Sequence, residues 1–330
     1  MKQTSILSKK RILIVSVQGL GDLIMIYPCL KILDWNKIEY DIIVKDDVSI
    51  DLLKMLKLNH LNKIYTIKNI FNKLIFKKYD LVIPQSTISP LKYILFSFYL
   101  RCFYNGIIIY KLIINNSNYS VHTCLKNFRL FKSLFPNLAV KENDFLSQFY
   151  YNHIKIPKRS NTVLIAPGGG VLERHKHLPS ATISKLIHLL FVEKNNYKFI
   201  IIGGQDTISL ANNIVNEVKN YDSSINIYSV AGETNFYQLF SLISSSKIVI
   251  SACNGISHIA GFLGATIYGF YGPTNPNITG PFTQNLYTGI TNLSCAPCYT
   301  KANWRGCGQP VCMQNFDLPG AVRMISSLLK

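Results

Sequence analysis

The strongest constraint on the fold is a repeated pattern in which a short apolar run ends in a turn and a helix-like stretch follows. Residues 11–17 (RILIVSV) form a continuous apolar run, and residues 20–33 then carry apolar side chains at helical spacing. Such a run is typical of a parallel strand that is buried on both faces. Similar runs at residues 40–44, 63–67 and 79–83 predict further strands, with helices between them.

The remainder of this half predicts helices at residues 93–103 and 121–135 around a short strand at residues 106–110. A membrane-spanning helix is disfavoured, because the most apolar region, residues 91–114, is interrupted by Lys92, Arg101, Asn105 and Lys111. The chain begins with polar and basic residues, and the first apolar run is too short for a signal peptide. We therefore expect a cytoplasmic protein whose eight cysteines are mostly reduced.

The strand-and-helix pattern restarts in the second half of the chain. Strands are predicted at residues 162–166, 197–202, 225–230, 247–251 and 265–271, and each ends in a glycine-containing turn. Alternating strands and helices indicate doubly wound parallel sheets of the α/β class. We predict two Rossmann-like domains, residues 1–155 and 156–330, joined near residues 151–161. A closing helix at residues 318–329 could pack back on the first domain.

The glycine-bearing strand ends of the second half indicate a site for a nucleoside diphosphate. Ligands of open parallel sheets bind beyond the carboxyl ends of the strands, where helix N-termini favour phosphate. One glycine in a tight turn is weak evidence, because such turns need glycine for structural reasons alone. Five consecutive turns of this kind favour ligand binding.

The first half carries a different turn, Gln18-Gly19-Leu20-Gly21-Asp22. A dinucleotide fingerprint would require a third glycine where this chain has Ile24, so binding of a nicotinamide cofactor is disfavoured. Asp22 near a helix start has two interpretations. It could cap the helix or complement its dipole, or it could be a general base that faces a cleft between the domains. The pattern alone favours neither.

The chain is strongly basic, with 35 Lys and Arg against 17 Asp and Glu and a net charge of +18. Such an excess attracts anions, for example phosphorylated sugars or anionic lipid headgroups. A general bias is an equal alternative, because Lys, Asn and Ile are abundant throughout the sequence. The longest basic run is Lys9-Lys10-Arg11, so we expect no nucleic-acid partner.

Three groups of motifs, in order along the chain, resemble glycosyltransferase family nine, the heptosyltransferases of lipopolysaccharide core assembly. They are residues 19–24 (GLGDLI) with Pro28 and Leu30, residues 166–169 (APGG) with 176–179 (KHLP), and residues 250–276 (ISACNGISHIAGFLGATIYGFYGPTNP). The resemblance implies the GT-B fold, with the acceptor in the first domain and the donor in the second. It also implies inversion at the anomeric carbon without a cofactor or catalytic metal.

The resemblance implies roles for individual residues. Asp22 is expected to take the proton from the acceptor hydroxyl, and Lys176 to stabilise the leaving diphosphate. The other donor-binding positions that it implies are Gly169, Gly204, Asp206, Thr234, Asn254, Gly255 and His258. The expected donor is ADP-heptose, and the expected acceptor is an anionic core glycan or glycolipid. A lipid-linked acceptor would bring the protein to the inner face of the inner membrane as a peripheral protein.

Two departures from the family pattern leave other functions open. Cys253 and Asn254 stand where the family usually has an acidic residue followed by Ser or Thr, and Leu178 replaces an aromatic residue of the lysine motif. The altered pair raises the alternatives of a UDP- or GDP-sugar donor, or of an inactive nucleotide- or glycan-binding module. Retention of Asp22 and Lys176 argues against the inactive module. A nucleotide-sugar epimerase shares the layout but fits the Gly-Pro-Thr-Asn-Pro segment poorly.

Four cysteines near the end of the chain have metal-ligand spacing, C-x2-C-x8-C-x4-C: Cys295, Cys298, Cys307 and Cys312. Four thiolates in such a span can surround one tetrahedral ion, most simply a structural Zn²⁺. Free thiols and disulfides are the alternatives.

Overall fold

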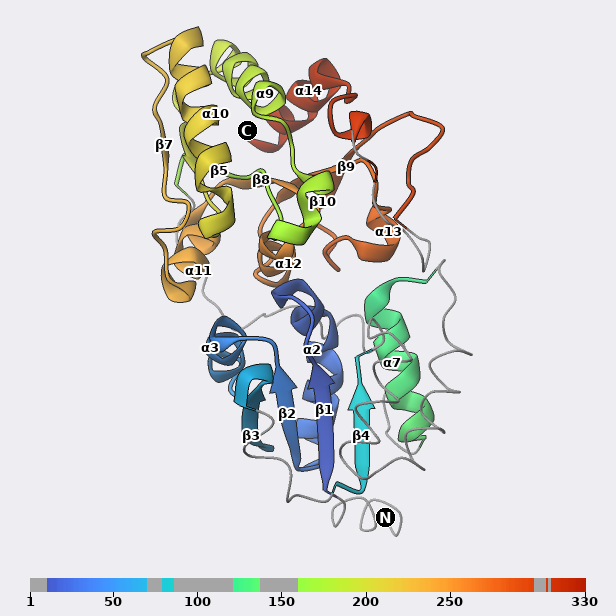
Figure 1. Ribbon diagram of the computed structural model, residues 1–330. Helices are drawn as coiled ribbons and strands as arrows, with labels where there is room; N and C mark the ends of the chain where they lie inside the picture. Colours follow the sequence, from blue (N-terminus) through green and yellow to red (C-terminus); the bar gives the residue numbers. More distant parts are fainter. Residues whose placement is uncertain (1–10, 70–78, 86–120, 137–159, 300–306, 308–309) are drawn as a thin grey trace. The chain divides into compact units, whose positions relative to one another are not determined.

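The computed structural model describes residues 11–69, 79–85, 121–136, 160–299, 307 and 310–330. The helix predicted at residues 93–103, the strand at 106–110 and the apolar region 91–114 lie outside the described residues. The chain divides into two compact units, Met1–Phe149 and Tyr150–Lys330 (Figure 1). Each unit is built on its own sheet.

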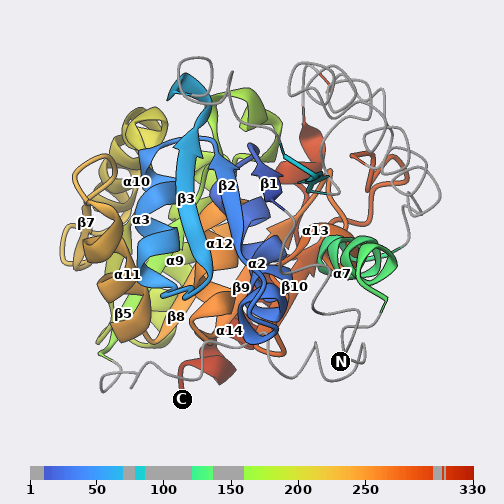
Figure 2. The ribbon, with the colours of Figure 1, turned by 90° about the horizontal axis from the view of Figure 1, so that it is seen from below.

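The sheet of the first unit is parallel and has the strand order β3-β2-β1-β4. Figure 2 shows β1, β2 and β3 side by side. Along the chain the described elements are β1 (Ile12–Ser16), α2 (Leu20–Trp35), β2 (Tyr40–Val44), α3 (Asp47–Met55), β3 (Leu61–Thr66), the short helix η1 (Ile67–Asn69), β4 (Leu81–Pro84) and α7 (Thr123–Leu134). Every residue of β1 and β2 is buried, as a continuous apolar run predicts.

The second sheet is also parallel and has the order β10-β9-β8-β5-β6-β7. The first elements of this unit are β5 (Thr162–Ala166), the 3-10 helix η2 (Val171–Lys176), α9 (Ser180–Glu193), β6 (Lys198–Ile201), η3 (Gln205–Thr207), α10 (Ile208–Tyr221), β7 (Ile227–Ser229) and α11 (Phe236–Ser245). They are followed by β8 (Ile248–Ala252), α12 (Gly255–Phe262), β9 (Ile267–Tyr271), α13 (Pro276–Thr279), β10 (Leu286–Ile290), η4 (Val311–Met313) and α14 (Leu318–Leu328).

Helices cover both faces of the second sheet. Alternate strand residues, including Ile165, Phe199 and Ile250, share one core with side chains of α9, α10 and α14. On the other face α11 packs on β5, and α12 packs on β8 and β9. The doubly wound α/β class predicted from the sequence is therefore confirmed.

The closing helix α14 packs against α9 within the second unit. Its apolar side chains Ala321, Val322 and Ile325 belong to the core of this unit, and the hydroxyl of Tyr197 donates to the carbonyl oxygen of Leu329 at 3.1 Å. The sequence had left open whether this helix packs back on the first domain. The apolar side chains of α14 contribute to the core of the second unit, and packing of this helix on the first domain stays a prediction.

One strand of the second sheet was not predicted. β10 pairs with β9 at the edge of the sheet, and all of its residues are half-buried or exposed. Its sequence, LYTGI, contains a glycine and no continuous apolar run, so it carries little strand signal. Among the described residues no helix is long and apolar enough to span a membrane.

We predict that Ile165→Ala lowers the free energy of unfolding of the second unit by about 2–5 kcal/mol, because it leaves a cavity in the core between β5 and the helices. Val192→Ala is the control, since Val192 is 69% exposed, and its effect should stay within about 0.5 kcal/mol. Urea titration followed by circular dichroism measures both. Equal losses would contradict the assignment of the core.

Candidate functional site

The strand order of the second sheet places a switch point between β5 and β8. The chain proceeds from β5 outward through β6 and β7, and then returns to β8 on the opposite side of β5. Ligands of open α/β sheets bind in the crevice at such a point, beyond the carboxyl ends of the strands. The turn Pro167-Gly168-Gly169-Gly170 follows β5, and Cys253-Asn254 follows β8.

Asn254 joins these two strand ends. Its side-chain Nδ2 donates to the carbonyl oxygens of Ala166 at 3.0 Å and Gly168 at 2.7 Å. Its Oδ1 accepts from the backbone N–H of Ser257 at 3.0 Å and so caps the N-terminus of α12. Both N–H bonds of this amide are therefore used within the protein. In this structure Asn254 shapes the glycine turn, and its side chain has no further N–H to offer a nucleotide-sugar donor.

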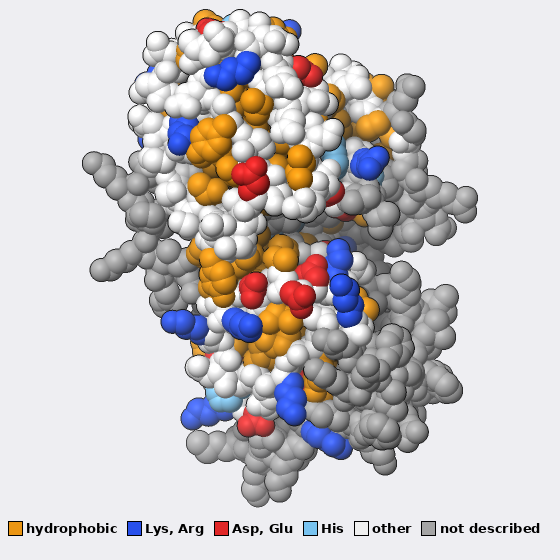
Figure 3. All heavy atoms as spheres, turned by 60° about the vertical axis from the view of Figure 1, so that its left-hand side comes forward, with side chains coloured by type: hydrophobic (Ala, Val, Ile, Leu, Met, Phe, Trp, Pro, Cys, Tyr) orange, Lys and Arg blue, Asp and Glu red, His pale blue; other side chains and the backbone are white. Residues whose placement is uncertain are grey.

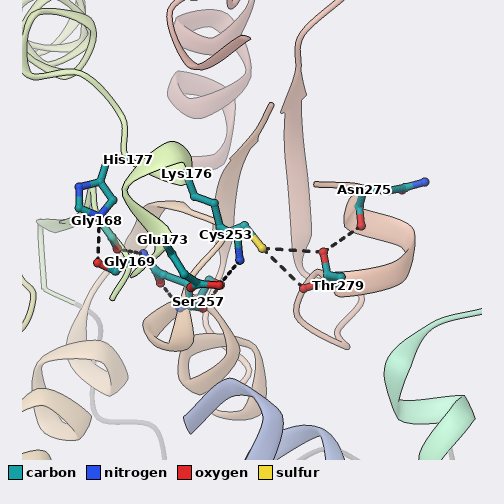
Figure 4. Close-up of polar contacts among 10 residues, drawn as sticks. Gly168, Gly169, Glu173, Lys176, His177, Cys253, Ser257, Asn275 and Thr279 are labelled. Atoms are coloured by element: carbon teal, nitrogen blue, oxygen red, sulfur yellow. Dashed lines mark hydrogen bonds and ion pairs between the residues drawn. The ribbon is translucent and has the colours of Figure 1, made fainter. Parts of the chain in front are cut away.

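Lys176 is the buried cation of this region. It ends η2, is 6% exposed, and its Nζ lies 2.5 Å from Oε1 of Glu173. Figure 4 shows the Lys176 side chain reaching toward Glu173 beside Cys253. Two contacts fix this loop to the turn after β5. The ring Nε2 of His177 lies 2.9 Å from the carbonyl oxygen of Gly169. The backbone N–H of Leu178 donates to the carbonyl oxygen of Pro167 at 2.8 Å.

The surroundings of Lys176 keep it charged. Burial by itself would lower the pKa of Lys176, but Cys253, Glu173 and Tyr299 outweigh burial and raise the pKa above its ordinary value. Burial, followed by the charge of Lys176, lowers the pKa of His175 to about 4. At neutral pH the loop therefore presents one buried ammonium group beside a neutral imidazole.

The start of α12 lies at the same strand end. Gly255 is its first residue, and His258, in the first turn, is 6% exposed. The first turn of a helix has N–H groups without intrahelical partners, and the helix dipole favours an anion there. Lys176 and the N-terminus of α12 thus both suit a diphosphate near the β5–β8 switch point.

The other predicted donor residues follow neighbouring strands. Gly169 lies in the turn after β5 and is half-buried. Gly204 and the exposed Asp206 form the start of η3 after β6, and the half-buried Thr234 follows β7. All of them lie beyond the carboxyl ends of parallel strands, on the side of the sheet where ligands bind.

Asp22 lies in the first turn of α2, beyond the carboxyl end of β1. The N-cap residue of this helix is Gly19, and Asp22 lies in the first turn, where a carboxylate complements the helix dipole. The strand order gives the first sheet a switch point between β1 and β4. There the buried Gln85 accepts from the Ser16 hydroxyl at 2.8 Å and donates from Nε2 to the backbone carbonyl of Asp22 at 2.5 Å.

The four clustered cysteines do not form the predicted metal site in this structure. Cys295 and Cys307 are exposed, Cys298 is half-buried and Cys312 is buried, and all four are free thiols. Burial raises the pKa of Cys312, and the other three cysteines raise it further. Within the described part of the chain, no group of three or more His, Cys, Asp or Glu residues is placed to hold a metal ion. The described residues therefore give no support to the predicted structural zinc ion.

Sequence reasoning missed three residues that support the predicted site. Glu173 precedes Lys176 by three residues in a helical turn, and this spacing could have indicated the ion pair. Gln85 directly follows a strand, as ligand-side residues do. Tyr299, whose ring centre lies 4.5 Å from Nζ of Lys176, had no local signal because its contact is long-range.

Basic side chains are dispersed over the surface that Figure 3 draws. Lys and Arg side chains of the described residues occur in both units there and are separated by uncharged and acidic side chains. On this face the described Lys and Arg side chains do not gather into one basic patch.

The family model of glycosyltransferase family 9 (heptosyltransferase) matches residues 122–307, more than half of the chain. The chain belongs to glycosyltransferase family 9. It is thus a glycosyltransferase of the heptosyltransferase family, as the motifs predicted. The matched range includes Lys176 and Asn254 but not Asp22.

Individual relatives are distant. Lipopolysaccharide heptosyltransferase 2 of Escherichia coli K12 is 24% identical over 153 residues, which is 46% of this chain and 42% of the relative. The match thus spans less than half the length of that relative. The structure of E. coli ADP-heptose lps heptosyltransferase II has a TM-score of 0.66 at 17% identity, with 97% of this chain and 98% of that chain covered.

A further similar structure is the dodecameric iron-containing heptosyltransferase TibC in complex with ADP-D-beta-D-heptose. Its TM-score is 0.61 at 14% identity, and the alignment covers 98% of this chain and 78% of that chain. At these identities the structural matches establish the fold, and the predicted GT-B fold of two parallel-sheet α/β domains is confirmed.

We predict that Asn254→Asp destabilises the second unit by about 1–3 kcal/mol, because a carboxylate would face the carbonyl oxygens of Ala166 and Gly168 without a proton to donate. Asn235→Asp is the matched control. Asn235 caps α11 in the same way but is exposed, and Asp caps helices as well as Asn does. Urea titration compares them, and equal stabilities of the two variants would contradict the bridging role of Asn254.

Proposed function

We propose that this family 9 enzyme transfers a heptose from ADP-heptose to an anionic lipopolysaccharide core or related cell-envelope glycan, with inversion at the anomeric carbon. The observation that carries the proposal is the buried ammonium group of Lys176 near the β5–β8 switch point, close to the N-terminus of α12. A buried cation and a helix N-terminus together suit the diphosphate of a nucleotide sugar. The similar TibC structure is a complex with ADP-D-beta-D-heptose, and the similar E. coli enzyme is named ADP-heptose lps heptosyltransferase II, which favours that donor.

In the proposed reaction Asp22 accepts the proton of the acceptor hydroxyl while its oxygen attacks the anomeric carbon of the donor. The bond between that carbon and the diphosphate oxygen breaks, and the electron pair leaves with the nucleoside diphosphate. Lys176 and the first N–H groups of α12 stabilise the negative charge that develops on this leaving group. Lys176 supplies the positive charge in this proposal, so no catalytic metal is required.

The other donor residues are assigned by the strand ends that they follow. Gly169, Gly255 and His258 are proposed to face the diphosphate, while Gly204, Asp206 and Thr234 are proposed to contact the ribose or the base. Asn254 is proposed to act indirectly, by holding the turn around Gly169. The acceptor is proposed to be anionic because the chain has a net charge of +18, and a lipid-linked acceptor would bring the enzyme to the inner membrane surface.

A second candidate function keeps the same chemistry with a UDP- or GDP-sugar as donor. The specific observation behind it is Cys253, which is buried beside Lys176 and replaces the acidic residue usual in the family. Loss of a carboxylate would change which sugar hydroxyls can be recognised. Turnover measured with ADP-heptose against UDP- and GDP-sugars separates the two candidates.

We predict that Asp22→Asn lowers kcat at least about 100-fold and leaves ADP affinity unchanged, because the amide cannot accept the proton. Transfer of heptose from ADP-heptose to a heptose-deficient core acceptor measures turnover, and calorimetry measures ADP binding. Asp47→Asn is the matched control, since Asp47 lies in the first turn of α3 in the same unit and is exposed. A variant at Asp22 that keeps turnover, or that loses ADP affinity instead, contradicts its role as the base.

A further inference from the structure

The ammonium group of Lys176 has an aromatic neighbour that comes from a distant part of the sequence. Its Nζ lies 4.5 Å from the ring centre of Tyr299. The same ring stacks on His175, with ring centroids 5.6 Å apart and an interplanar angle of 24°. Tyr299 therefore contacts two consecutive residues of η2. A cation over an aromatic face is attracted by the ring, and more strongly when it is shielded from water as Lys176 is.

Tyr299 is held in place by the end of β9. The backbone N–H groups of Cys298 and Tyr299 both donate to the carbonyl oxygen of Pro273, at 3.0 and 2.7 Å. Pro273 follows β9 by two residues in the Gly-Pro-Thr turn. Residues 295–312 form the cysteine-bearing segment. Its described start is thus fixed to the carboxyl end of β9, at the edge of the sheet where the nucleotide sugar is proposed to bind.

The other described end of this segment packs on the adjacent residue, Gly272. A side chain at this position would bring its Cβ within 2.7 Å of Sδ of Met313 and 2.9 Å of Sγ of Cys312. Cys312 and Met313 are 5% and 1% exposed and belong to the core of the second unit. Both described ends of the segment therefore contact the Gly272-Pro273 turn after β9. This turn and the buried Cys312 and Met313 anchor Tyr299 to the second unit.

We propose that Tyr299 is a positioning residue for donor binding, which holds the Lys176 ammonium group at the β5–β8 switch point. The proposal rests on the proposed function of Lys176 as the diphosphate ligand. The family lysine motif usually carries its own aromatic residue, but here Leu178 occupies that position and is fully buried in the core. Tyr299 supplies an aromatic face from outside the motif.

An aromatic ring can hold the Lys176 ammonium group during donor binding better than the carboxylate of Glu173 can. Glu173 pairs with Lys176, and 37% of its side chain is exposed. An arriving diphosphate would compete with this carboxylate for the ammonium group and repel it. The Tyr299 ring offers Lys176 an aromatic face and not a carboxylate counter-ion, so it can remain on Lys176 while a phosphate replaces Glu173 as the counter-ion.

The test measures Lys176 directly, without nucleotide. Acetylation by sulfo-N-hydroxysuccinimide acetate reports access to the neutral amine, and mass spectrometry compares Lys176 with the exposed Lys185 in the same sample. Tyr299→Leu should speed acetylation of Lys176 about fivefold or more, because the residue loses both shielding and cation stabilisation. Tyr299→Phe keeps the ring and should restore the slow rate. Repeating the rates over a range of pH should show the apparent pKa of Lys176 lowered only in Tyr299→Leu.

The matched control is Tyr228→Leu, which removes a similar contact elsewhere in the unit, between the Tyr228 ring and Nζ of Lys198 at 4.7 Å. It should leave the acetylation of Lys176 unchanged. In calorimetry with ADP, Tyr299→Leu should weaken binding about fivefold, the worth of one cation–π contact, whereas Tyr299→Phe and Tyr228→Leu should not.

The experiments distinguish failure of the positioning role of Tyr299 from failure of the proposed ADP-containing donor. If Tyr299→Leu leaves both the rate and the pH profile of Lys176 acetylation unchanged, or if Tyr299→Phe behaves as Leu does, the positioning role is overturned whatever the nucleotide results. If the wild-type protein binds no ADP, the proposed donor is overturned, and the acetylation rates still decide separately whether Tyr299 holds the ammonium group.

Discussion

The hydrogen bonds of one buried amide organise the second unit around its switch point. Asn254 ties the carbonyl oxygens of Ala166 and Gly168 to the N-terminus of α12 and so fixes two strand ends relative to each other. A buried amide with all its N–H bonds satisfied is rigid, whereas a single lost partner would leave a desolvated polar group at a cost of about 1–3 kcal/mol. The glycine turn, the loop that carries Lys176 and the start of α12 all depend on this junction.

The first unit uses a similar arrangement with a different residue. Gln85, at the end of β4, connects the Ser16 hydroxyl at the end of β1 to the backbone of Asp22. In both units an amide side chain therefore spans the gap between neighbouring strands whose connections run in opposite directions. A parallel sheet leaves its strand-end backbone groups without ladder partners at this point. An amide can satisfy a donor and an acceptor together, which explains why Asn and Gln serve here.

Local patterns predicted the fold well and the contacts of the site poorly. The strands at residues 40–44 and 162–166 were predicted with their observed bounds, because buried parallel strands are continuous apolar runs. The edge strand β10 has no such run and was missed. Lys176 and Asn254 stood out through their motifs, but the sequence did not reveal that the Asn254 amide is used internally. Tyr299 reaches Lys176 through long-range packing, which no local pattern records.

The central claim of this account is that a nucleoside diphosphate binds at the switch point of the second sheet through Lys176. Calorimetric titration with ADP, UDP, GDP and CMP tests it most directly, with the wild-type protein and Lys176→Gln side by side. The account predicts selective binding of ADP to the wild type and an affinity at least about tenfold lower in Lys176→Gln, since a hydrogen bond to a charged group is worth about 1.5–3 kcal/mol. Absence of nucleotide binding to the wild type, or equal ADP affinity in the variant, would contradict it.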